Sequence, residues 1–239
     1  MKIGLLVIAL GGDYRPYARY MLKSAAKFFP AHTPIVWTDD DFEMPSRSIR
    51  IRQNCLDFPQ ATLYRYRLFT EQTEVLRQFD QLFYCDADME FVAPVKESDI
   101  CSSGITATLH PGFTEARLDE KGRPISTGGV PERRHESTAC LSPDSKNQYF
   151  CGAFNGGDAK SFITMSGKLH HNIHLDMQKN IIAKWHDESH LNHYLFHNPP
   201  AKILSPSFCY PEGYKGQWGW KPTDHPPILV AVNKGGKIR

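Results

Sequence analysis

The sequence predicts an α/β domain with a mostly parallel sheet and flanking helices. Apolar runs of strand length alternate with longer segments whose apolar residues follow a helical period, and Gly, Pro and Asp separate them. Such alternation is typical of βαβ units, in which a crossover helix makes neighbouring strands parallel. The chain has 239 residues, 41% of them hydrophobic, without a repeat or linker, so we expect residues 1–239 to form one domain.

The predicted elements follow one another along the first half of the chain. In order they are a strand over residues 1–10 that runs into Gly11-Gly12-Asp13, a helix over 17–29 that Pro30 stops, a strand over 34–38, a helix over 62–79, a strand that ends at Cys85, and a strand over 105–109. Residues 119–143 are polar and rich in Gly, Pro and Arg, which favours a loop over a site.

Two carboxylates, Asp86 and Asp88, follow the strand that ends at Cys85. Burying ionised carboxylates is costly unless a cation or hydrogen-bond donors compensate. At the carboxyl ends of parallel strands, where α/β sheets bind ligands, such a pair can hold a divalent metal that neutralises a pyrophosphate. A solvated turn with incidental acids is the alternative for an Asp-x-Asp pair taken alone.

A second cluster of chemically active side chains lies in residues 183–192, AKWHDESHLN. Asp187 is a candidate helix cap, and apolar residues at i, i+3 and i+4 begin with Leu191. This places His186, Asp187 and Glu188 at a helix N-terminus, which suits anionic ligands and carboxylates with a perturbed pKa. An ordinary capped surface helix would explain Asp187 and Glu188 but not Trp185 and His186.

With these two clusters the chain resembles glycosyltransferase family 6, the group of the blood-group A and B transferases and the α1,3-galactosyltransferase. The matching segments keep the family's order and cover most of the chain: Tyr84–Val92, Thr108–Phe113, Glu132–Arg134, Tyr149–Gly157, Trp185–Asn192 and Leu204–Pro206. The resemblance implies a GT-A type nucleotide-binding fold. It also implies a retaining hexosyltransferase that moves galactose from UDP-galactose in α1,3 linkage onto a terminal β-galactoside, with or without fucose.

The resemblance also implies roles for individual residues. Asp86 and Asp88 would hold Mn²⁺ or another divalent cation against the donor's diphosphate, and Glu188 would be the catalytic carboxylate. The remaining donor-binding residues would be Ile8, Leu10, Tyr14, Arg65, Ala87, Cys151, Gly152, Ala153, His186, Asp187 and, in a basic tail that closes over the diphosphate, Lys234, Lys237 and Arg239. The acceptor-binding residues would be His110, Trp185 and Glu212.

Donor choice in the resembling enzymes depends on the segment that matches residues 151–153. Ala153 stands where a small side chain near the sugar's 2-position favours galactose. Cys151 departs from the residues familiar at its position, and a steric preference of this kind is worth only a few kcal/mol. UDP-N-acetylgalactosamine therefore stays open as the alternative donor.

Composition narrows the possible partners and compartments. A net charge of +2 without a basic block argues against nucleic acid. Six scattered Cys without a C-x-x-C pair indicate reduced thiols rather than a zinc ribbon or a disulfide framework. The apolar start is too short to span a membrane. Animal members of the resembling family carry a membrane anchor before the catalytic domain, so the resemblance implies a bacterial or phage-type cytoplasmic protein here. Such a protein can associate peripherally with the inner membrane through its acceptor.

Other classes share parts of this pattern. A haloacid-dehalogenase-like phosphohydrolase also has Asp-x-Asp after a strand, but Met89-Glu90 does not fit the residues that should follow. A metal-dependent nucleotidyltransferase could share the sheet and the Asp pair, and would release pyrophosphate from a nucleoside triphosphate. A non-catalytic glycan-binding module could use Trp185 and His110, but it would not need both the Asp pair and Glu188.

Overall fold

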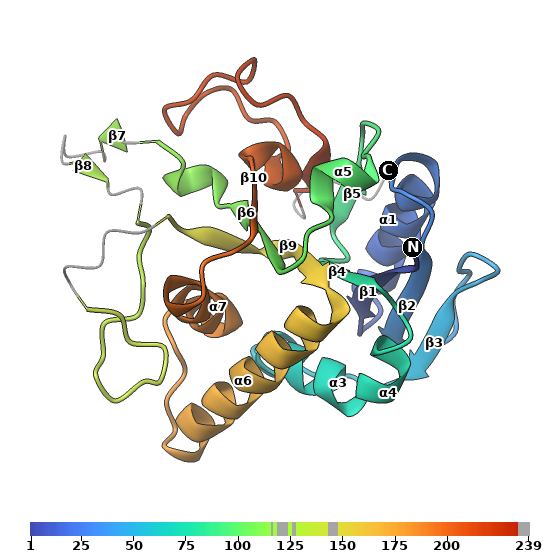
Figure 1. The fold of residues 1–239 in the computed structure, drawn as a ribbon, viewed down its shortest axis with the longest axis horizontal. Coiled ribbons are helices and arrows are strands. Elements are labelled where there is room, and N and C mark those ends of the chain that lie inside the picture. The colour runs from blue at the N-terminus through green and yellow to red at the C-terminus, as the bar shows by residue number, and fades with distance from the viewer. Residues whose placement is uncertain (116, 119–123, 126–127, 143–147, 234–239) are drawn as a thin grey trace.

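The computed structural model describes residues 1–115, 117–118, 124–125, 128–142 and 148–233. Its centre is a seven-stranded sheet in the order β10-β6-β9-β4-β1-β2-β3 (Figure 1). The strands are β1 (Ile3–Ala9), β2 (Thr33–Thr38), β3 (Ile49–Arg52), β4 (Gln81–Cys85), β6 (Ile105–Leu109), β9 (Phe150–Asp158) and β10 (Lys202–Leu204). Every neighbouring pair is parallel except that β9 runs antiparallel to β4 and β6. The predicted mostly parallel α/β fold is confirmed.

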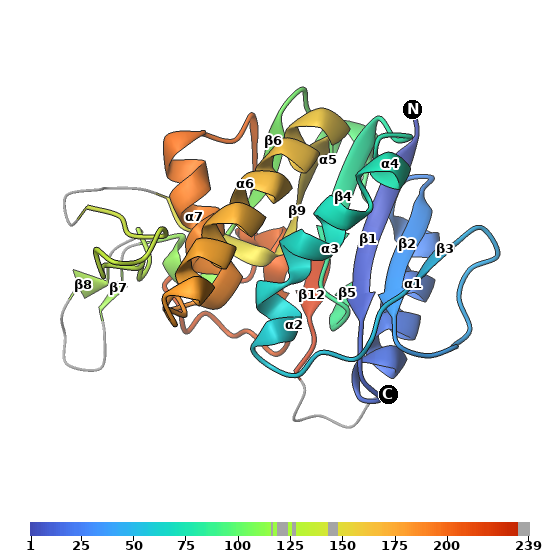
Figure 2. The same ribbon diagram turned by 90° about the horizontal axis from the view of Figure 1, so that it is seen from below.

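Helices cover both faces of this sheet (Figure 2). On one face, α1 (Tyr14–Phe28) buries Ala18, Met21, Leu22 and Ala25 against the apolar side of β1 and β4. On the other face, α3 (Arg65–Glu71), α6 (Ala159–Gln178) and α7 (His186–His197) form a second apolar cluster around Phe69, Phe162 and Leu191. Shorter helices are α2 (Gln60–Leu63), α4 (Thr73–Leu76) and α5 (Glu97–Ile100).

A small three-stranded sheet lies beside the Asp pair. It has the order β11-β12-β5 and consists of β11 (Tyr210–Pro211), β12 (Leu229–Ala231) and β5 (Met89–Phe91). The Val232 N–H donates to the Asp88 carbonyl at 2.9 Å, which brings the end of the described chain to this turn. The remaining elements are the pair β7 (Arg117–Leu118) and β8 (Pro124–Ile125) and the 3₁₀ turns η1 (Pro111–Phe113) and η2 (Pro206–Cys209).

Two local predictions are wrong. The helix predicted over residues 62–79 is three short helices, α2 to α4, and the Thr70 and Thr73 hydroxyls donate to the Tyr66 and Thr70 carbonyls near the break between α3 and α4. Threonine hydroxyls that bond nearby carbonyls compete with regular helix. The other wrong prediction is Asp187 as a helix cap. Helix α7 begins at His186 with Trp185 at its N-cap position, two residues earlier than a cap at Asp187 would give, and Asp187 pairs with the buried cation of Arg65.

Candidate active site

The turn that carries Asp86 and Asp88 is hydrogen-bonded to β9, beside residues 151–153. Asp86 directly follows β4, and its N–H donates to the Ala153 carbonyl of the neighbouring antiparallel strand β9 at 2.9 Å. Because β4 pairs over its whole length with residues 154–158 of β9, residues far apart in sequence meet at this edge of the sheet. The structure thus brings Asp86 next to residues 151–153.

A buried arginine joins three segments of the site. Arg65 of α3 is 7% exposed. Its guanidinium donates to Asp86 Oδ1 and to the Gly152 carbonyl, each at 3.0 Å, and lies 3.0 Å from Asp187 Oδ2. It also lies over the Tyr84 ring, 4.2 Å from the centroid. One cation therefore compensates two carboxylates from separate elements, which would otherwise be costly to bury together.

Asp86 combines burial with a free oxygen atom. Burial raises the pKa of its carboxyl to about 6, the Arg65 charge opposes this rise, and the Asp88 charge adds to it. The Tyr84 hydroxyl donates to Oδ1 at 2.5 Å, the atom that Arg65 also contacts. Within the described residues Oδ2 has no hydrogen bond, so it is available to a cation.

The two carboxylates fit a divalent cation that has further ligands from outside the protein. Within the described part of the chain, no group of three or more His, Cys, Asp or Glu side chains is placed to hold a metal. A hard cation needs about six oxygen ligands. Asp86 and Asp88 can supply the protein's share, and the oxygens of a bound diphosphate and water would supply the rest.

Glu188 lies in the first turn of α7 and faces β9. The Gly152 N–H donates to Glu188 Oε2 at 2.9 Å. Asn192, one turn later, accepts from the Phe150 N–H and donates to the Phe150 carbonyl, both at 2.8 Å, which fixes α7 against β9. Burial raises the pKa of the Glu188 carboxyl to about 7, although the Gly152 bond opposes the rise. The site therefore holds a carboxylate whose ionised form is poorly solvated, ready to stabilise a positive centre.

Aromatic side chains surround the start of α7. The Trp185 side chain is 47% exposed, and the backbone N–H of Trp185 donates to the Ser189 hydroxyl at 2.9 Å. His186 adopts a left-handed backbone conformation with φ 49°. Phe58, which is 74% exposed, places its ring edge-on to the His186 ring at 4.9 Å. Sequence reasoning missed Phe58, for which the only signal was an aromatic residue in a polar stretch before Pro59.

Glu132 is a second residue that sequence reasoning did not assign a role. It is buried and accepts from the Lys184 N–H at 2.8 Å, directly before Trp185. Its carboxylate also accepts from the backbone N–H groups of Arg133 and Arg134 and from the Arg134 guanidinium. These bonds, the one to Arg134 foremost, lower the pKa of Glu132 to about 2. Glu132 thus anchors the loop that presents Trp185.

The proposed nucleotide-side residues lie at the end of β1, the strand next to β4. Ile8 is half-buried, Leu10 is buried, and Tyr14 at the start of α1 is exposed. The Gly11 N–H donates to Asp39 Oδ1 at 3.1 Å, which joins the ends of β1 and β2. These residues lie at the same end of the sheet as the Asp pair, because β1 and β4 are parallel neighbours.

The proposed acceptor-binding residues are more dispersed. His110 Nδ1 accepts from the Gly112 N–H at 3.0 Å, and its ring contacts Phe113 and Tyr149. Glu212 is exposed and accepts from the Asn233 N–H at 2.8 Å. Lys234, Lys237 and Arg239 lie outside the described residues, as does part of the loop predicted over 119–143.

Cys151, Gly152 and Ala153 divide between the two faces of β9. Cys151 belongs to the apolar cluster that contains Cys209, and Ala153 packs against the same cluster. Gly152 faces the other way: a Cβ there would lie 3.4 Å from the Arg65 guanidinium and 3.7 Å from Glu188 Oε2. All six cysteines are free thiols.

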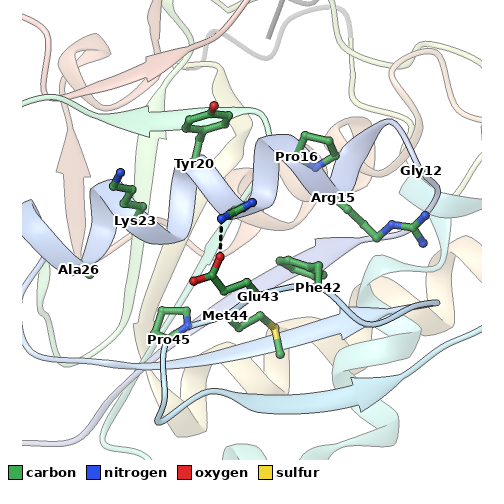
Figure 3. Close-up of a pocket in the computed structure, with 11 residues that line it drawn as sticks. Gly12, Arg15, Pro16, Tyr20, Lys23, Ala26, Phe42, Glu43, Met44 and Pro45 are labelled. Atoms are coloured by element: carbon green, nitrogen blue, oxygen red, sulfur yellow. Dashed lines mark hydrogen bonds and ion pairs between the residues drawn. The ribbon is translucent and has the colours of Figure 1, made fainter. Parts of the chain in front are cut away.

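A groove of about 930 Å³ lies apart from this cluster, between α1 and residues 42–45 (Figure 3). Arg15, Arg19 and Lys23 line its α1 side, and Arg19 pairs with Glu43 across it. None of the residues predicted to bind donor, acceptor or metal lines this groove. The described chain also contains no helix that is both long and apolar enough to cross a membrane.

Comparison with known proteins shows the family of the chain. The family profile of glycosyltransferase family 6 matches residues 1–220. The O-antigen biosynthesis glycosyltransferase WbnI of Escherichia coli is 31% identical over 221 residues, which are 90% of each chain. The histo-blood group ABO system transferase 2 of Rattus norvegicus is 29% identical over 90% of this chain and 65% of its own length. The globoside alpha-1,3-N-acetylgalactosaminyltransferase 1 of Canis lupus familiaris is 27% identical over 88% of this chain and 61% of its own. The chain belongs to glycosyltransferase family 6.

Proposed function

We propose that this glycosyltransferase is a retaining enzyme with a single catalytic domain. It transfers galactose from UDP-galactose in α1,3 linkage onto a terminal β-galactoside. The observation that carries the proposal is the connection of Glu188 to Asp86 through Gly152 and Arg65. This connection sets a poorly solvated carboxylate beside a pair of acids suited to a diphosphate-bound cation. Separation of charge between a sugar and its UDP leaving group needs both.

On the leaving-group side, Asp86 and Asp88 would hold a divalent cation, with Mn²⁺ the expected ion. When bound, the ion would neutralise charge on the diphosphate oxygens. The Arg65 guanidinium would keep the Asp86 carboxylate ionised and oriented. Lys234, Lys237 and Arg239 of the tail would add positive charge at the same diphosphate and exclude water.

On the sugar side, Glu188 would face the anomeric carbon. Retention of configuration is reached either by a covalent intermediate on this carboxylate or by front-side attack on an ion pair that it stabilises. The Gly152 N–H would hold one carboxylate oxygen and leave the other for the sugar. His186 and Asp187 would bind hydroxyls of the donor sugar, and Ile8, Leu10 and Tyr14 the uridine.

The resemblance places Ala153 near the sugar's 2-position, where its methyl group would occupy space that an N-acetyl group needs, and this favours galactose as the donor sugar. The relatives' names include an N-acetylgalactosaminyltransferase, so UDP-N-acetylgalactosamine is the alternative donor. Their names also refer to O-antigen, blood-group and globoside glycans, which supports a glycan acceptor. His110, Trp185 and Glu212 would bind it. We place the reaction in the cytoplasm, with contact to the inner membrane through the acceptor.

A panel of UDP-sugars tests this proposal. The unmutated protein is incubated with each donor and with lactose as a soluble β-galactoside, with Mn²⁺ or with EDTA. Transfer from UDP-galactose that requires the metal is the expected result. Faster transfer from UDP-N-acetylgalactosamine would show that this sugar, and not galactose, is the preferred donor sugar. Full activity in EDTA would refute the metal role of Asp86 and Asp88.

A further inference from the structure

Helix α1 carries four cations in one row along its length. Arg15, Arg19, Lys23 and Lys27 follow one another at intervals of four residues, and the helix contains no Asp or Glu. Residues four apart are neighbours on a helix surface, and like charges at this spacing destabilise the helix. A row of this kind costs stability in the isolated chain, so it indicates an anionic partner outside the chain.

The opposite side of α1 is fixed to the sheet. Ala18, Met21, Leu22 and Ala25 are buried there, at the spacing of a single helix face. They pack in the apolar cluster that contains the buried residues of β1. Because this face cannot leave the core, α1 holds its cations in a fixed row on the outside of the protein.

The first two cations of the row are partly neutralised. The Arg15 guanidinium lies 3.5 Å from Asp39 Oδ1 and 3.2 Å from Asp40 Oδ2. Arg19 pairs with Glu43 across the groove that α1 forms with residues 42–45. These pairs hold the start of the row against the neighbouring loop and leave its second half as the stronger positive surface.

Lys23 and Lys27 form this second half. Both are exposed, and in the part of the chain that the structure describes neither has a carboxylate partner. The Lys27 ammonium lies over the Phe28 ring, 4.5 Å from its centroid. Tyr20, which is 47% exposed, projects from α1 together with Lys23 on the side away from Glu43 (Figure 3). Tyrosine has an apolar ring and a polar tip, which suits the interface between lipid and water.

The place of the row in the fold fits a flat partner. Twelve residues separate Arg15 from Lys27, which is about 18 Å along a helix axis. Helix α1 covers a face of the sheet, whereas Asp86 follows the end of β4 at the sheet's edge (Figure 2). An extended anionic surface could therefore meet the whole row and leave the candidate active site open.

We propose that the outer side of α1 docks on the anionic headgroups of a lipid bilayer. The inference deepens the proposed function, which places the glycan acceptor at the inner membrane, and it rests on that function for the benefit that docking brings. A bilayer surface of negative charge attracts clustered Lys and Arg side chains. Docking would keep the enzyme close to an acceptor that a lipid carries. The attraction itself needs neither UDP-sugar nor acceptor.

Cosedimentation with vesicles tests the docking on the full chain without UDP-sugar. The chain should bind vesicles of phosphatidylglycerol and phosphatidylcholine but not vesicles of phosphatidylcholine alone. Binding should be lost when the ionic strength rises from about 0.1 M to about 1 M, because the Debye length falls from about 10 Å to about 3 Å. No binding to the anionic vesicles, or equal binding to both kinds, would overturn the proposal. Binding to a nucleic-acid duplex but not to anionic vesicles would assign the row to another partner and would overturn it too.

A double variant, Lys23→Gln with Lys27→Gln, locates the surface. Its partition constant on the anionic vesicles should fall about 25-fold, since each cation near such a surface contributes about fivefold. Gln is a good helix former and the change removes repulsion, so the Tm should not fall. The matched control is Lys168→Gln with Lys179→Gln, at exposed lysines in α6 and directly after it, with the same change in net charge. Equal partition constants of the double variant and this control would refute the assignment to α1.

Transfer rates separate docking from the reaction. The double variant should transfer to lactose in solution as fast as the unmutated protein, and more slowly to lactosylceramide in anionic vesicles. Equal rates on the vesicle-borne acceptor would contradict the benefit of docking. If the vesicles bind the chain but no UDP-sugar is turned over, the proposed reaction fails and the docking surface stands. If lactose is galactosylated but the anionic vesicles do not bind the chain, the docking surface alone is wrong.

Discussion

Replacement of Glu188 by Gln should change activity and stability in opposite directions. The Glu188 carboxylate accepts from the Gly152 N–H at 2.9 Å. Burial raises the pKa of its carboxyl from 4.5 to about 7. Gln keeps the size and an acceptor oxygen for Gly152, but it cannot carry the charge. The variant therefore removes a poorly solvated anion together with the proposed partner of the anomeric carbon.

The stability effect has a defined sign and pH range. Between pH 4.5 and about 7, the folded state binds more protons than the unfolded state, because Glu188 is still protonated in the folded protein. The free energy of unfolding therefore falls as the pH rises through this range. The stability contributed by protonated Glu188 is fully present below the range and is lost above it. The difference between the two pKa values corresponds to at most about 3 kcal/mol. At pH 8, Glu188→Gln should melt up to about 6–12 °C above the unmutated protein, because about 2–4 °C per kcal/mol is usual for a chain of this size. Near pH 4.5 the Tm of Glu188→Gln should equal that of the unmutated protein.

Thermal melts at pH 4.5, 6 and 8 without ligand measure the stability effect, and Glu136→Gln, at an exposed glutamate, is the control. The kcat of Glu188→Gln should fall by about 10²-fold or more, with UDP affinity nearly unchanged. A Tm difference that does not depend on pH would refute the reasoning about burial. A near-normal kcat would transfer the catalytic role to another carboxylate, with Asp187 the first to examine.

Three further predictions concern the donor. Asp88→Asn should lose most of the turnover and Asp86→Asn much of it, with the fold intact. Equal rates of the unmutated protein with Mn²⁺ and in EDTA would contradict the metal role of the two residues. Ala153→Gly should raise the kcat/KM for UDP-N-acetylgalactosamine relative to that for UDP-galactose about tenfold, since one methyl group in a pocket is worth roughly 1–3 kcal/mol. An unchanged ratio of the two kcat/KM values would show that Ala153 does not face the sugar's 2-position. Deletion of residues 234–239 should weaken UDP-sugar binding by calorimetry but leave the ligand-free Tm nearly unchanged. Unaltered affinity and kcat would show that the tail has no role.

The sequence predicts the parts of this protein that depend on local pattern. Strand-length apolar runs locate β1, β2, β4 and β6, and the alternation with helices predicts the parallel pairing of β1 with β2 and β4. The position of Asp86 at a strand end follows from the same pattern, because a carboxylate directly after a buried strand must lie at the sheet's edge. Chemically unusual clusters such as residues 185–192 are also visible without a structure.

Contacts between distant segments are not visible in this way. The antiparallel insertion of β9 between β4 and β6 gives Asp86 its partner carbonyl, yet nothing local in β9 specifies the direction of pairing. Asp187 resembles a helix cap in sequence, and only the cation of Arg65, brought from α3, explains why it is buried. Phe58 lies against the His186 ring, a contact that the residues next to it in the sequence do not reveal.

The product of one reaction tests the central claim most directly. The unmutated protein is incubated with UDP-galactose, lactose and Mn²⁺, and the products are examined by proton NMR. Retaining transfer predicts one UDP for each new galactosyl residue, with the α-anomeric signal and a linkage to O3 of the acceptor galactose. A β-anomeric product, or release of pyrophosphate from a nucleoside triphosphate without transfer from any UDP-sugar, would contradict the account.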